Sequence, residues 1–323
     1  MSVRWGIVGC GDVVRRRVAQ AIFDEPNSEI VGACRRNSKS LAEFCHRFGV
    51  PKSFEQDKDL FHDSEIDAVY IATPVNIHLP QTIAAAEQGK HVLVEKPMAM
   101  STVECNEMIA VCRANHVKLG VAYYRRFYPV VARIKEVLAS GEIGELLSIN
   151  FTTAAAFAID PHEDGYWRVI PEQGGGGALM DIGSHRIDLM LHMFGPIEQV
   201  RCLCGTVAAN YSAENCVSAV MRFRNGVHGN LQCFFGSSID PDEFTLTGTK
   251  GRIVSAPLNG GDLKIQTAST SREESHPPCN NFNLPLIADF VRAIKEDRDP
   301  MITGDNGRDV NQVIEQAYAN ANK

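Results

Sequence analysis

One aspartate and one histidine have the residue types and the spacing for acid–base chemistry. Asp181 and His185 lie four positions apart in a segment with helical spacing, residues 178–193, so one face of that helix presents both side chains. An imidazole titrates near neutral pH and can accept or donate the proton of a hydroxyl group. The carboxylate can orient the imidazole or bind a substrate hydroxyl. The pair therefore predicts chemistry at a carbinol or a carbonyl group.

Lys96 is a third candidate because of its place after a strand. It follows the apolar run at residues 91–94, and the ligands of parallel sheets bind at the carboxyl ends of the strands. An ammonium group at that point can hydrogen-bond a reacting oxygen and stabilise developing alkoxide charge. The alternative is a lysine that only faces solvent.

The Asp181–His185 pair also has two simpler interpretations. It can be an ordinary pair on a helix, or half of a metal site completed by Asp188 and His192. Structural zinc sites usually take four protein ligands, and the sequence has no further ligand cluster. We therefore predict no metal.

A glycine turn follows the first expected strand, residues 3–8, and opens a helix. Its residues are Gly9, Cys10, Gly11, Asp12, Val13 and Val14. Gly9 permits the tight turn, Gly11 lets the backbone approach a pyrophosphate, and the N-terminus of the helix favours phosphate charge. Val14 stands where a third glycine or alanine is usual, so the packing of the helix is expected to differ. This position in the chain favours a dinucleotide site over an ordinary strand–helix turn.

The residues after the second expected strand, 29–34, indicate which dinucleotide. The chain continues with Arg35, Arg36, Asn37 and Ser38, without the acid that usually accepts the adenosine ribose hydroxyls. An arginine can hold a 2′-phosphate through a charge-assisted fork and can stack on adenine. The sequence therefore predicts that NADP is preferred and that NAD is the weaker cofactor. Two arginines that are only solvated are the alternative.

The elements that position these residues alternate in the first part of the chain. Apolar strand-like runs at 3–8, 29–34, 66–72, 91–94 and 118–122 are separated by helical segments at 15–23, 40–48, 79–88 and 102–115. Ser40 and Glu43 fit a capping box for one of these helices. Alternation with nearly all-apolar strands predicts an α/β Rossmann domain, a doubly wound parallel sheet, over residues 1–122.

The second part, residues 123–323, has another pattern. A helical segment at 128–139 precedes strand-like runs at 148–153, 199–203, 216–223, 226–235, 244–247, 252–255 and 263–267, joined by short turns. These runs predict an α+β domain with a mostly antiparallel open sheet. Helical segments at 284–296 and 307–320 close the chain, and the C-terminal helix can pack back on the first domain.

The composition excludes several classes of protein. Of 323 residues, 44% are hydrophobic and 22% charged, which predicts a globular protein, and the net charge of −7 disfavours nucleic acid as a partner. No apolar run is long enough to cross a bilayer, and no separate apolar segment precedes the first strand. The ten cysteines contain no CxxC pair, which favours reduced thiols in a cytoplasmic protein.

Two longer segments resemble one known family. Residues 69–97 contain Ala-Thr-Pro-Val-Asn-Ile-His and end in Glu-Lys-Pro, and residues 174–188 read Gly-Gly-Gly-Gly-Ala-Leu-Met-Asp-Ile-Gly-Ser-His-Arg-Ile-Asp. In this order they resemble the glucose–fructose oxidoreductase / inositol dehydrogenase (Gfo/Idh/MocA) family, and the resemblance covers essentially the whole chain.

The resemblance implies roles residue by residue. The cofactor pyrophosphate would be lined by Gly9, Cys10, Gly11, Asp12 and Val13. The cofactor would be flanked by Thr73, Pro74, Asn76 and His78, with its nicotinamide ribose near Glu95, Lys96 and Pro97. The catalytic positions of the family match Lys96, Asp181 and His185. Relatives contact substrate at the positions of Tyr124, Arg126, Trp167 and Arg168.

The predicted function is an NAD(P)-dependent oxidoreductase, with NADP preferred, that transfers hydride between nicotinamide and a sugar, a polyol or a related hydroxy or keto compound. His185 would be the acid or base, Lys96 the partner of the oxyanion, and Asp181 the orienting carboxylate. The alternative is a regulatory protein of the same fold that senses a nucleotide or a sugar without turnover. Relatives often pair through the open face of the second sheet, which implies a homodimer or a homotetramer.

Overall fold

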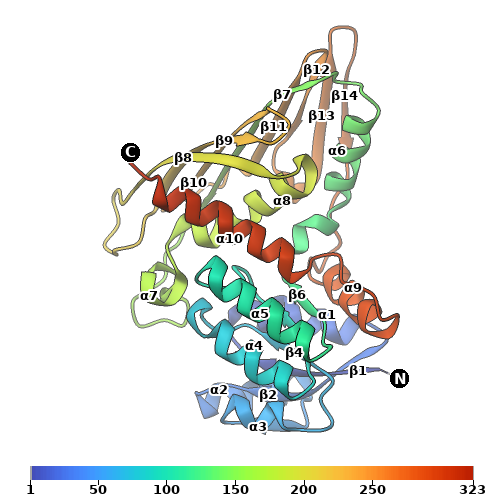
Figure 1. Ribbon diagram of the computed structural model, residues 1–323, viewed down its shortest axis with the longest axis vertical. Coiled ribbons are helices and arrows are strands. Elements are labelled where there is room, and N and C mark those ends of the chain that lie inside the picture. The colour runs from blue at the N-terminus through green and yellow to red at the C-terminus, as the bar shows by residue number, and fades with distance from the viewer. Residues whose placement is uncertain (1, 323) are drawn as a thin grey trace. The chain divides into compact units, whose positions relative to one another are not determined.

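The structure, a computed structural model, describes residues 2–322 and groups the chain in two units. The first unit combines residues 1–124 with 281–311, and the second combines 125–280 with 312–323. The chain therefore passes between the units three times (Figure 1). Each unit has its own sheet.

The sheet of the first unit has six strands in the order β3-β2-β1-β4-β5-β6, all of them parallel. The strands are β1 (Val3–Val8), β2 (Ser28–Cys34), β3 (Lys52–Phe54), β4 (Ala68–Ile71), β5 (His91–Val94) and β6 (Leu119–Val121). Nearly every residue of β1, β4, β5 and β6 is buried, as the apolar runs predicted. The strand order reverses between β1 and β4, which is where doubly wound sheets bind ligands. The predicted Rossmann sheet is confirmed.

Helices cover this sheet. They are a π-helical turn (Val14–Val18), α1 (Ala19–Asp24), α2 (Ser38–Phe48), α3 (Asp57–Phe61), α4 (His78–Glu87), α5 (Thr102–Ala114) and α9 (Leu284–Lys295). Helices α4 and α5 lie side by side (Figure 1). Helix α9 comes from the C-terminal part of the chain, and its Phe290 packs against Trp5 of β1 with ring centroids 5.7 Å apart.

Helix α2 begins earlier than its sequence predicted. The expected start at Ser40 with a Ser40–Glu43 capping box is wrong, because the helix starts at Ser38 and its cap is Asn37. The Asn37 side chain accepts a hydrogen bond from the Ser40 backbone N–H at 2.9 Å. Asparagine caps a helix as well as serine does, which explains the earlier start.

The second unit contains an eight-stranded sheet in the order β14-β13-β12-β11-β7-β10-β9-β8. Its strands are β7 (Leu146–Ala155), β8 (Ile197–Gly205), β9 (Cys216–Phe223), β10 (His228–Phe235), β11 (Glu243–Gly248), β12 (Gly251–Ser255), β13 (Asp262–Thr267) and β14 (Ser271–Ser275). Neighbours pair antiparallel except β7 and β10, which are parallel. The expected open, mostly antiparallel sheet is confirmed. Along β9, exposed and buried residues alternate, so one face of the sheet is covered and the other is open.

The helices that accompany this sheet include α6 (Pro129–Ala139), α7 (Pro171–Gly174), a second π-helical turn (Leu179–Gly183) and α8 (Ser184–Phe194). The π-helical turn packs on β7 and β10. The long α10 (Gly304–Ala319) carries the chain from the first unit into the second. Among residues 2–322, no helix combines the length and the apolar character that a membrane crossing needs.

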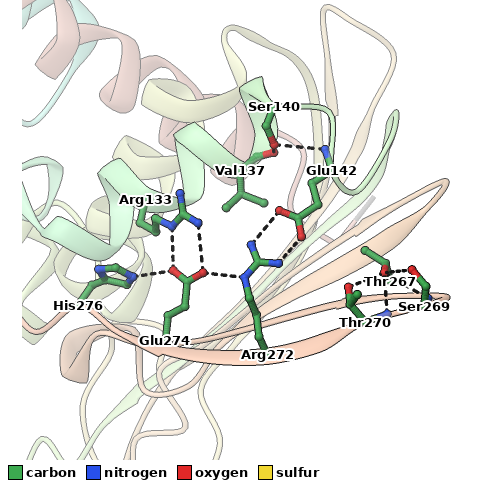
Figure 2. Close-up of polar contacts among 10 residues, drawn as sticks. All are labelled: Arg133, Val137, Ser140, Glu142, Thr267, Ser269, Thr270, Arg272, Glu274 and His276. Carbon is green, nitrogen blue, oxygen red and sulfur yellow. Dashed lines mark hydrogen bonds and ion pairs between the residues drawn. The ribbon is translucent and has the colours of Figure 1, made fainter.

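A charged network holds the edge strand β14 against α6 (Figure 2). Arg133 of α6 donates two hydrogen bonds to Glu274 of β14, at 2.8 and 3.1 Å. Arg272 and His276 contact the same carboxylate at 2.8 Å each, and Arg272 also pairs with Glu142. Glu274 therefore has three cationic or hydrogen-bonding neighbours, which fix an otherwise polar edge strand.

Candidate active site

The glycine turn after β1 has the geometry that a phosphate-binding turn needs. Gly9 has φ +89°, and a Cβ there would lie 2.7 Å from the carbonyl oxygen of Ala72, so only glycine fits. At Gly11, by contrast, no atom of the described residues lies within 4 Å of the Cβ position once its two chain neighbours are set aside. The backbone is thus open on the side where a pyrophosphate would approach, and the residues present fit a dinucleotide.

Val14, which replaces the usual third glycine or alanine, is fully buried and begins the π-helical turn. The helix after the glycine turn therefore starts wider than an α-helix, which agrees with the expectation of altered packing. Of the flanking residues, Val13 is partly buried. Asp12 is exposed and pairs with Arg16 at 2.8 Å.

Arg35 lies next to the glycine turn. Its Nη1 donates a hydrogen bond to the Cys10 carbonyl oxygen at 2.5 Å. Arg36 and Ser38 are both exposed, and Ser38 is the first residue of α2. The end of β2 thus presents a guanidinium beside the turn and carries no acidic side chain.

The loop after β4 is built around His78, which is fully buried. One ring nitrogen lies 2.9 Å from the Thr73 carbonyl oxygen and the other 3.1 Å from the Met98 carbonyl oxygen. Burial lowers the pKa of this imidazole. His78 therefore connects the loop after β4 to the loop after β5, while Asn76 is exposed.

Thr73 is held by residues that the sequence did not single out. Its hydroxyl donates to Gln81 Oε1 at 2.6 Å, and Gln81 Nε2 donates to Asp57 Oδ2 at 2.8 Å. This chain of hydrogen bonds fixes the Thr73 hydroxyl next to Pro74, at the carboxyl end of β4. Gln81 lies one helical turn after His78, and no local pattern marks it.

The Glu-Lys-Pro segment follows β5. Glu95 accepts a hydrogen bond from the Tyr70 hydroxyl at 2.7 Å and one from the Lys96 backbone N–H at 3.1 Å. Burial raises the pKa of Tyr70 well above its usual value, so the phenol remains a donor. The Lys96–Pro97 peptide bond is cis. Glu95 thus fixes the backbone from which the partly buried Lys96 side chain projects.

Tyr124, a predicted substrate contact, belongs to an aromatic cluster in the first unit. It stacks with Phe282 at a centroid distance of 6.3 Å, and the Arg17 guanidinium lies 5.5 Å from its ring centroid. Arg17 follows the glycine turn and Phe282 follows the second chain crossing, so residues far apart in sequence meet here. No local sequence pattern marks either of these two partners.

In the second unit, the π-helical turn and α8 carry Asp181 and His185. Asp181 is partly exposed and His185 is buried. Arg168 Nε lies 3.8 Å from Asp181 Oδ2, and its guanidinium lies 4.6 Å from the ring centroid of Trp167. The structure therefore brings three of the predicted residues together, Trp167, Arg168 and Asp181. π-Helical turns inside helices often occur at functional sites.

Two buried ion pairs hold α8. Arg126 donates from Nε and Nη2 to Asp188, with a shortest distance of 2.6 Å, and Arg186 pairs with Asp242. Burial raises the pKa of Asp188 to about 6 in spite of its arginine. Arg126 Nε and Nη2 bind Asp188 and are therefore not available to a substrate. Arg168, in contrast, lies beside Asp181 and Trp167. Among residues 2–322, no group of three or more His, Cys, Asp or Glu side chains could hold a metal ion.

Comparison with known proteins identifies two family regions. Residues 3–123 match the model described as "Oxidoreductase family, NAD-binding Rossmann fold", and residues 131–254 match "GFO/IDH/MocA C-terminal domain". Together the two regions cover most of the chain.

Three similar proteins span most of this chain. Oxidoreductase P35 of Formosa agariphila is 36% identical over 253 residues, 78% of either chain. The 1,5-anhydro-D-fructose reductase of Ensifer adhaerens is 28% identical over 94% of this chain and 92% of its own. A solved structure of levoglucosan dehydrogenase with NADH and levoglucosan is 25% identical, with a TM-score of 0.89 over 99% of this chain and 97% of the other. Together with its sheet order and its glycine turn, these matches show that the chain is an oxidoreductase with an NAD-binding Rossmann fold and belongs to the GFO/IDH/MocA family.

Proposed function

We propose that this protein is an NADP-preferring dehydrogenase or reductase of sugars, polyols or related hydroxy and keto compounds. The observation that carries the proposal is the parallel sheet in the order β3-β2-β1-β4-β5-β6, with the open glycine turn after β1. The candidate catalytic residues are the second support for the proposal. Lys96 lies in the first unit, and Asp181 and His185 lie in the second.

The first unit would bind the dinucleotide. Residues 9–13 would surround the pyrophosphate, with Thr73, Pro74 and Asn76 beside the cofactor and Glu95, Lys96 and Pro97 near the nicotinamide ribose. His78 would act through Thr73 and Met98, whose carbonyl oxygens it contacts. Arg35, beside the Cys10 carbonyl, would hold a 2′-phosphate, with Arg36 and Ser38 at its edge. That arginine and the absence of an acid after β2 support NADP over NAD.

The chemical step divides among three side chains. The bound nicotinamide would supply or accept the hydride. His185 would donate a proton to the substrate oxygen in the reductive direction and remove it in the oxidative direction. Lys96 would hydrogen-bond the same oxygen and stabilise its negative charge. Asp181 would orient the imidazole or a substrate hydroxyl, with Trp167 and Arg168 beside it.

The names of two relatives support a carbohydrate-like substrate. One is a reductase of 1,5-anhydro-D-fructose, and the other is a dehydrogenase whose structure holds levoglucosan. Both compounds are anhydrosugars, which present neighbouring hydroxyl groups on a rigid ring. A site that contains an imidazole, a carboxylate and a guanidinium has the hydrogen-bonding groups that such a ring requires.

A substrate panel tests this function. Purified protein would be incubated with NADPH and keto sugars, and with NADP⁺ and anhydrosugars, polyols and aldoses, while the absorbance of reduced nicotinamide is followed. Turnover in at least one class is expected, and Lys96→Ala should abolish it while NADPH binding is retained. Tight NADPH binding without turnover across the panel would favour a sensor and contradict the enzyme. Full turnover in Lys96→Ala would contradict the role of Lys96.

We also propose that two copies pair through the open face of the eight-stranded sheet. Leu203 of β8 is 66% exposed and Val220 of β9 is 54% exposed, and their register places both on that face. Asn230 of β10, opposite Val220, donates to Asn150 of β7 at 2.7 Å and continues the same row. Light scattering should therefore give a dimer or tetramer for the native chain and a smaller species for Val220→Asp. A native monomer would contradict the proposal.

A further inference from the structure

The start of the helical segment with Asp181 and His185 is held by a single residue, Glu214. Its Oε2 accepts a hydrogen bond from the Gly177 backbone N–H at 2.8 Å, and its Oε1 accepts one from the Leu179 N–H at 3.0 Å. Its backbone carbonyl accepts a third, from the Ala178 N–H at 3.1 Å. The first N–H groups of a helix have no partner inside the helix. Glu214 binds three of them in succession.

The glycines before this helix are shaped to this contact. A Cβ on Gly177 would overlap the carbonyl oxygen of Glu214, and a Cβ on Gly176 would overlap the hydroxyl of Tyr318. Neither glycine has a φ between +20° and +160°, so backbone conformation alone does not require glycine at either position. Close approach of Glu214 and Tyr318 does require it. The glycine run is therefore a docking surface for these two residues.

Tyr318, near the end of α10, also binds this carboxylate. Its hydroxyl donates to Glu214 Oε1 at 2.9 Å. Burial raises the pKa of this phenol well above its usual value, so it remains a donor. Burial also raises the pKa of Glu214, and the bonds from Leu179, Tyr318 and Gly177 act in the opposite direction. All three groups donate, which is the arrangement that a carboxylate requires.

The backbone beneath Glu214 is itself fixed. The next residue, Asn215, is buried, and its side chain exchanges two hydrogen bonds with Val207, each 2.7 Å long. Its backbone N–H donates to Gly205 of β8, and its carbonyl accepts from Phe235 of β10. Glu214 therefore projects from a point tied to two strands. A rigid base of this kind is what a positioning residue requires.

We propose that Glu214 is a positioning residue that sets the orientation of Asp181 and His185, with Tyr318 holding its carboxylate. The link to the reacting groups is short. The Gly177 N–H donates to Glu214. The Gly177 carbonyl oxygen accepts a hydrogen bond from the Asp181 backbone N–H at 3.0 Å. His185 follows one turn later on the same helical segment. This inference rests on the catalytic roles proposed above for Asp181 and His185.

Glu214→Gln is the informative substitution because it keeps size and shape. The amide can accept at only one of its two ends, so one backbone N–H would face an NH2 group. The turn should shift, and kcat should fall roughly 10- to 100-fold, the range expected for a lost hydrogen bond to a charged group. The Kd for NADPH should be unchanged. Tyr318→Phe keeps the contacts of Glu214 with the Gly177 and Leu179 N–H groups. It should therefore lower kcat by a smaller factor, below about tenfold.

A matched control is Glu25→Gln in the first unit. Glu25 is also a buried carboxylate, and it accepts the Asn27 backbone N–H at 2.7 Å. This variant should lose stability without a change in kcat at a temperature where it is folded. If Glu214→Gln behaves like Glu25→Gln, with a lower Tm and an unchanged kcat, Glu214 has only a structural role and the inference is overturned. If Glu214→Gln does not fold, Tyr318→Phe takes its place as the test. An unchanged kcat in Tyr318→Phe would then overturn the positioning role of Glu214.

Hydrogen exchange separates this inference from the proposed function. Exchange of the backbone N–H groups at residues 177–181, followed by mass spectrometry, should be faster in Glu214→Gln and unchanged in Glu25→Gln. A wild-type protein without turnover, but with this exchange pattern, would contradict the enzyme and leave the contact intact. Unchanged exchange together with unchanged kcat, in a wild type that turns over, would contradict the positioning role alone.

Discussion

The guanidinium of Arg126 and the carboxylate of Asp188 form a buried ion pair with a shortest distance of 2.6 Å. Asp188 lies three residues after His185, on the same helix. An arginine predicted as a substrate contact therefore holds the helix of a proposed catalytic residue. Its Nε and Nη2 are both used in this contact.

Asp188→Asn should destabilise the protein strongly. The substitution leaves the Arg126 charge buried without its counter-charge, and breaking a buried pair in this way costs about 3–5 kcal/mol. Urea denaturation, monitored by circular dichroism, measures the difference in unfolding free energy between the native protein and Asp188→Asn. The double variant Arg126→Met/Asp188→Leu is the control and should recover most of the loss, since it removes both charges. A loss below about 1 kcal/mol in Asp188→Asn would show that water reaches the pair.

His78→Ala should weaken NADPH binding although we assign His78 no direct contact with the cofactor. The imidazole lies between the carbonyl oxygens of Thr73 and Met98. A neutral ring donates its one N–H to one of them, and removal of the ring leaves that acceptor without this partner, at about 1–3 kcal/mol. Both loops should loosen, so that the Tm falls and the Kd for NADPH rises. Asn76→Ala, at an exposed position of the same loop, should leave the Tm unchanged. Equal effects of the two substitutions would contradict the role of His78.

Acid should destabilise the protein in part through His192. Burial lowers its pKa to about 4, and its Nε2 lies 3.2 Å from Lys135 Nζ. The folded protein then holds a neutral imidazole at a pH where the unfolded chain would protonate it. The contribution of His192 to the free energy of unfolding is therefore fully present above about pH 6.5, and it is lost as the pH drops towards 4.

His192→Gln tests this origin. Between pH 6.5 and 4, the slope of unfolding free energy against pH should decrease by up to one proton, about 1.4 kcal/mol per pH unit. Urea denaturation across that range gives the slope. His162→Gln, at an exposed loop position, should leave it close to the native value. An unchanged slope in His192→Gln would assign the acid sensitivity to other groups.

Glu274→Gln should loosen the edge strand β14. Arg133 holds the pKa of Glu274 well below its usual value, with Arg272 and His276 acting in the same direction. The network therefore stabilises the protein above the ordinary glutamate pKa of 4.5, and the stabilisation is lost as the pH falls below it. At neutral pH the variant should lose about 1–2 kcal/mol, and hydrogen exchange in β14 should quicken.

Its neighbour Glu273 provides the control. This carboxylate is 76% exposed and pairs with Lys264 at 2.9 Å. Glu273→Gln should change the stability by less than about 0.5 kcal/mol. The difference between the two variants should narrow at pH 3. A constant difference down to that pH would show that the charge of Glu274 does not carry the effect.

The sequence predicted features that depend on local patterns. Mostly apolar runs without polar alternation predicted the positions of β1, β4 and β5. The glycine turn predicted which end of the sheet binds the ligand. Strand β14 escaped prediction because its residues, Ser-Arg-Glu-Glu-Ser, are polar, and pairing with β13 and the contacts of Glu274 decide its conformation. Tertiary contacts, and no local pattern, likewise decide which residues return to the first unit, 281–311.

The site residues divide in the same way. Residue type and position selected Lys96, Asp181 and His185 as candidates. Glu214 and Gln81 were not found, because each acts through a partner far away in sequence or through a backbone group. A glycine run offered one indirect signal, since Gly176 and Gly177 must lie against some other part of the chain. Sequence patterns indicate groups that carry chemistry more readily than groups that support them.

The most direct test of the account is a calorimetric titration of NADPH and of NADH into the native protein and into Arg35→Ala/Arg36→Ala. We expect tight binding of NADPH to the native protein, weakened about 10- to 100-fold in the variant, the range for a charge-assisted contact. The affinity for NADH should be the same in both proteins. An equal loss for the two cofactors would contradict the 2′-phosphate role of Arg35, and a native protein that binds neither cofactor would contradict the proposed function itself.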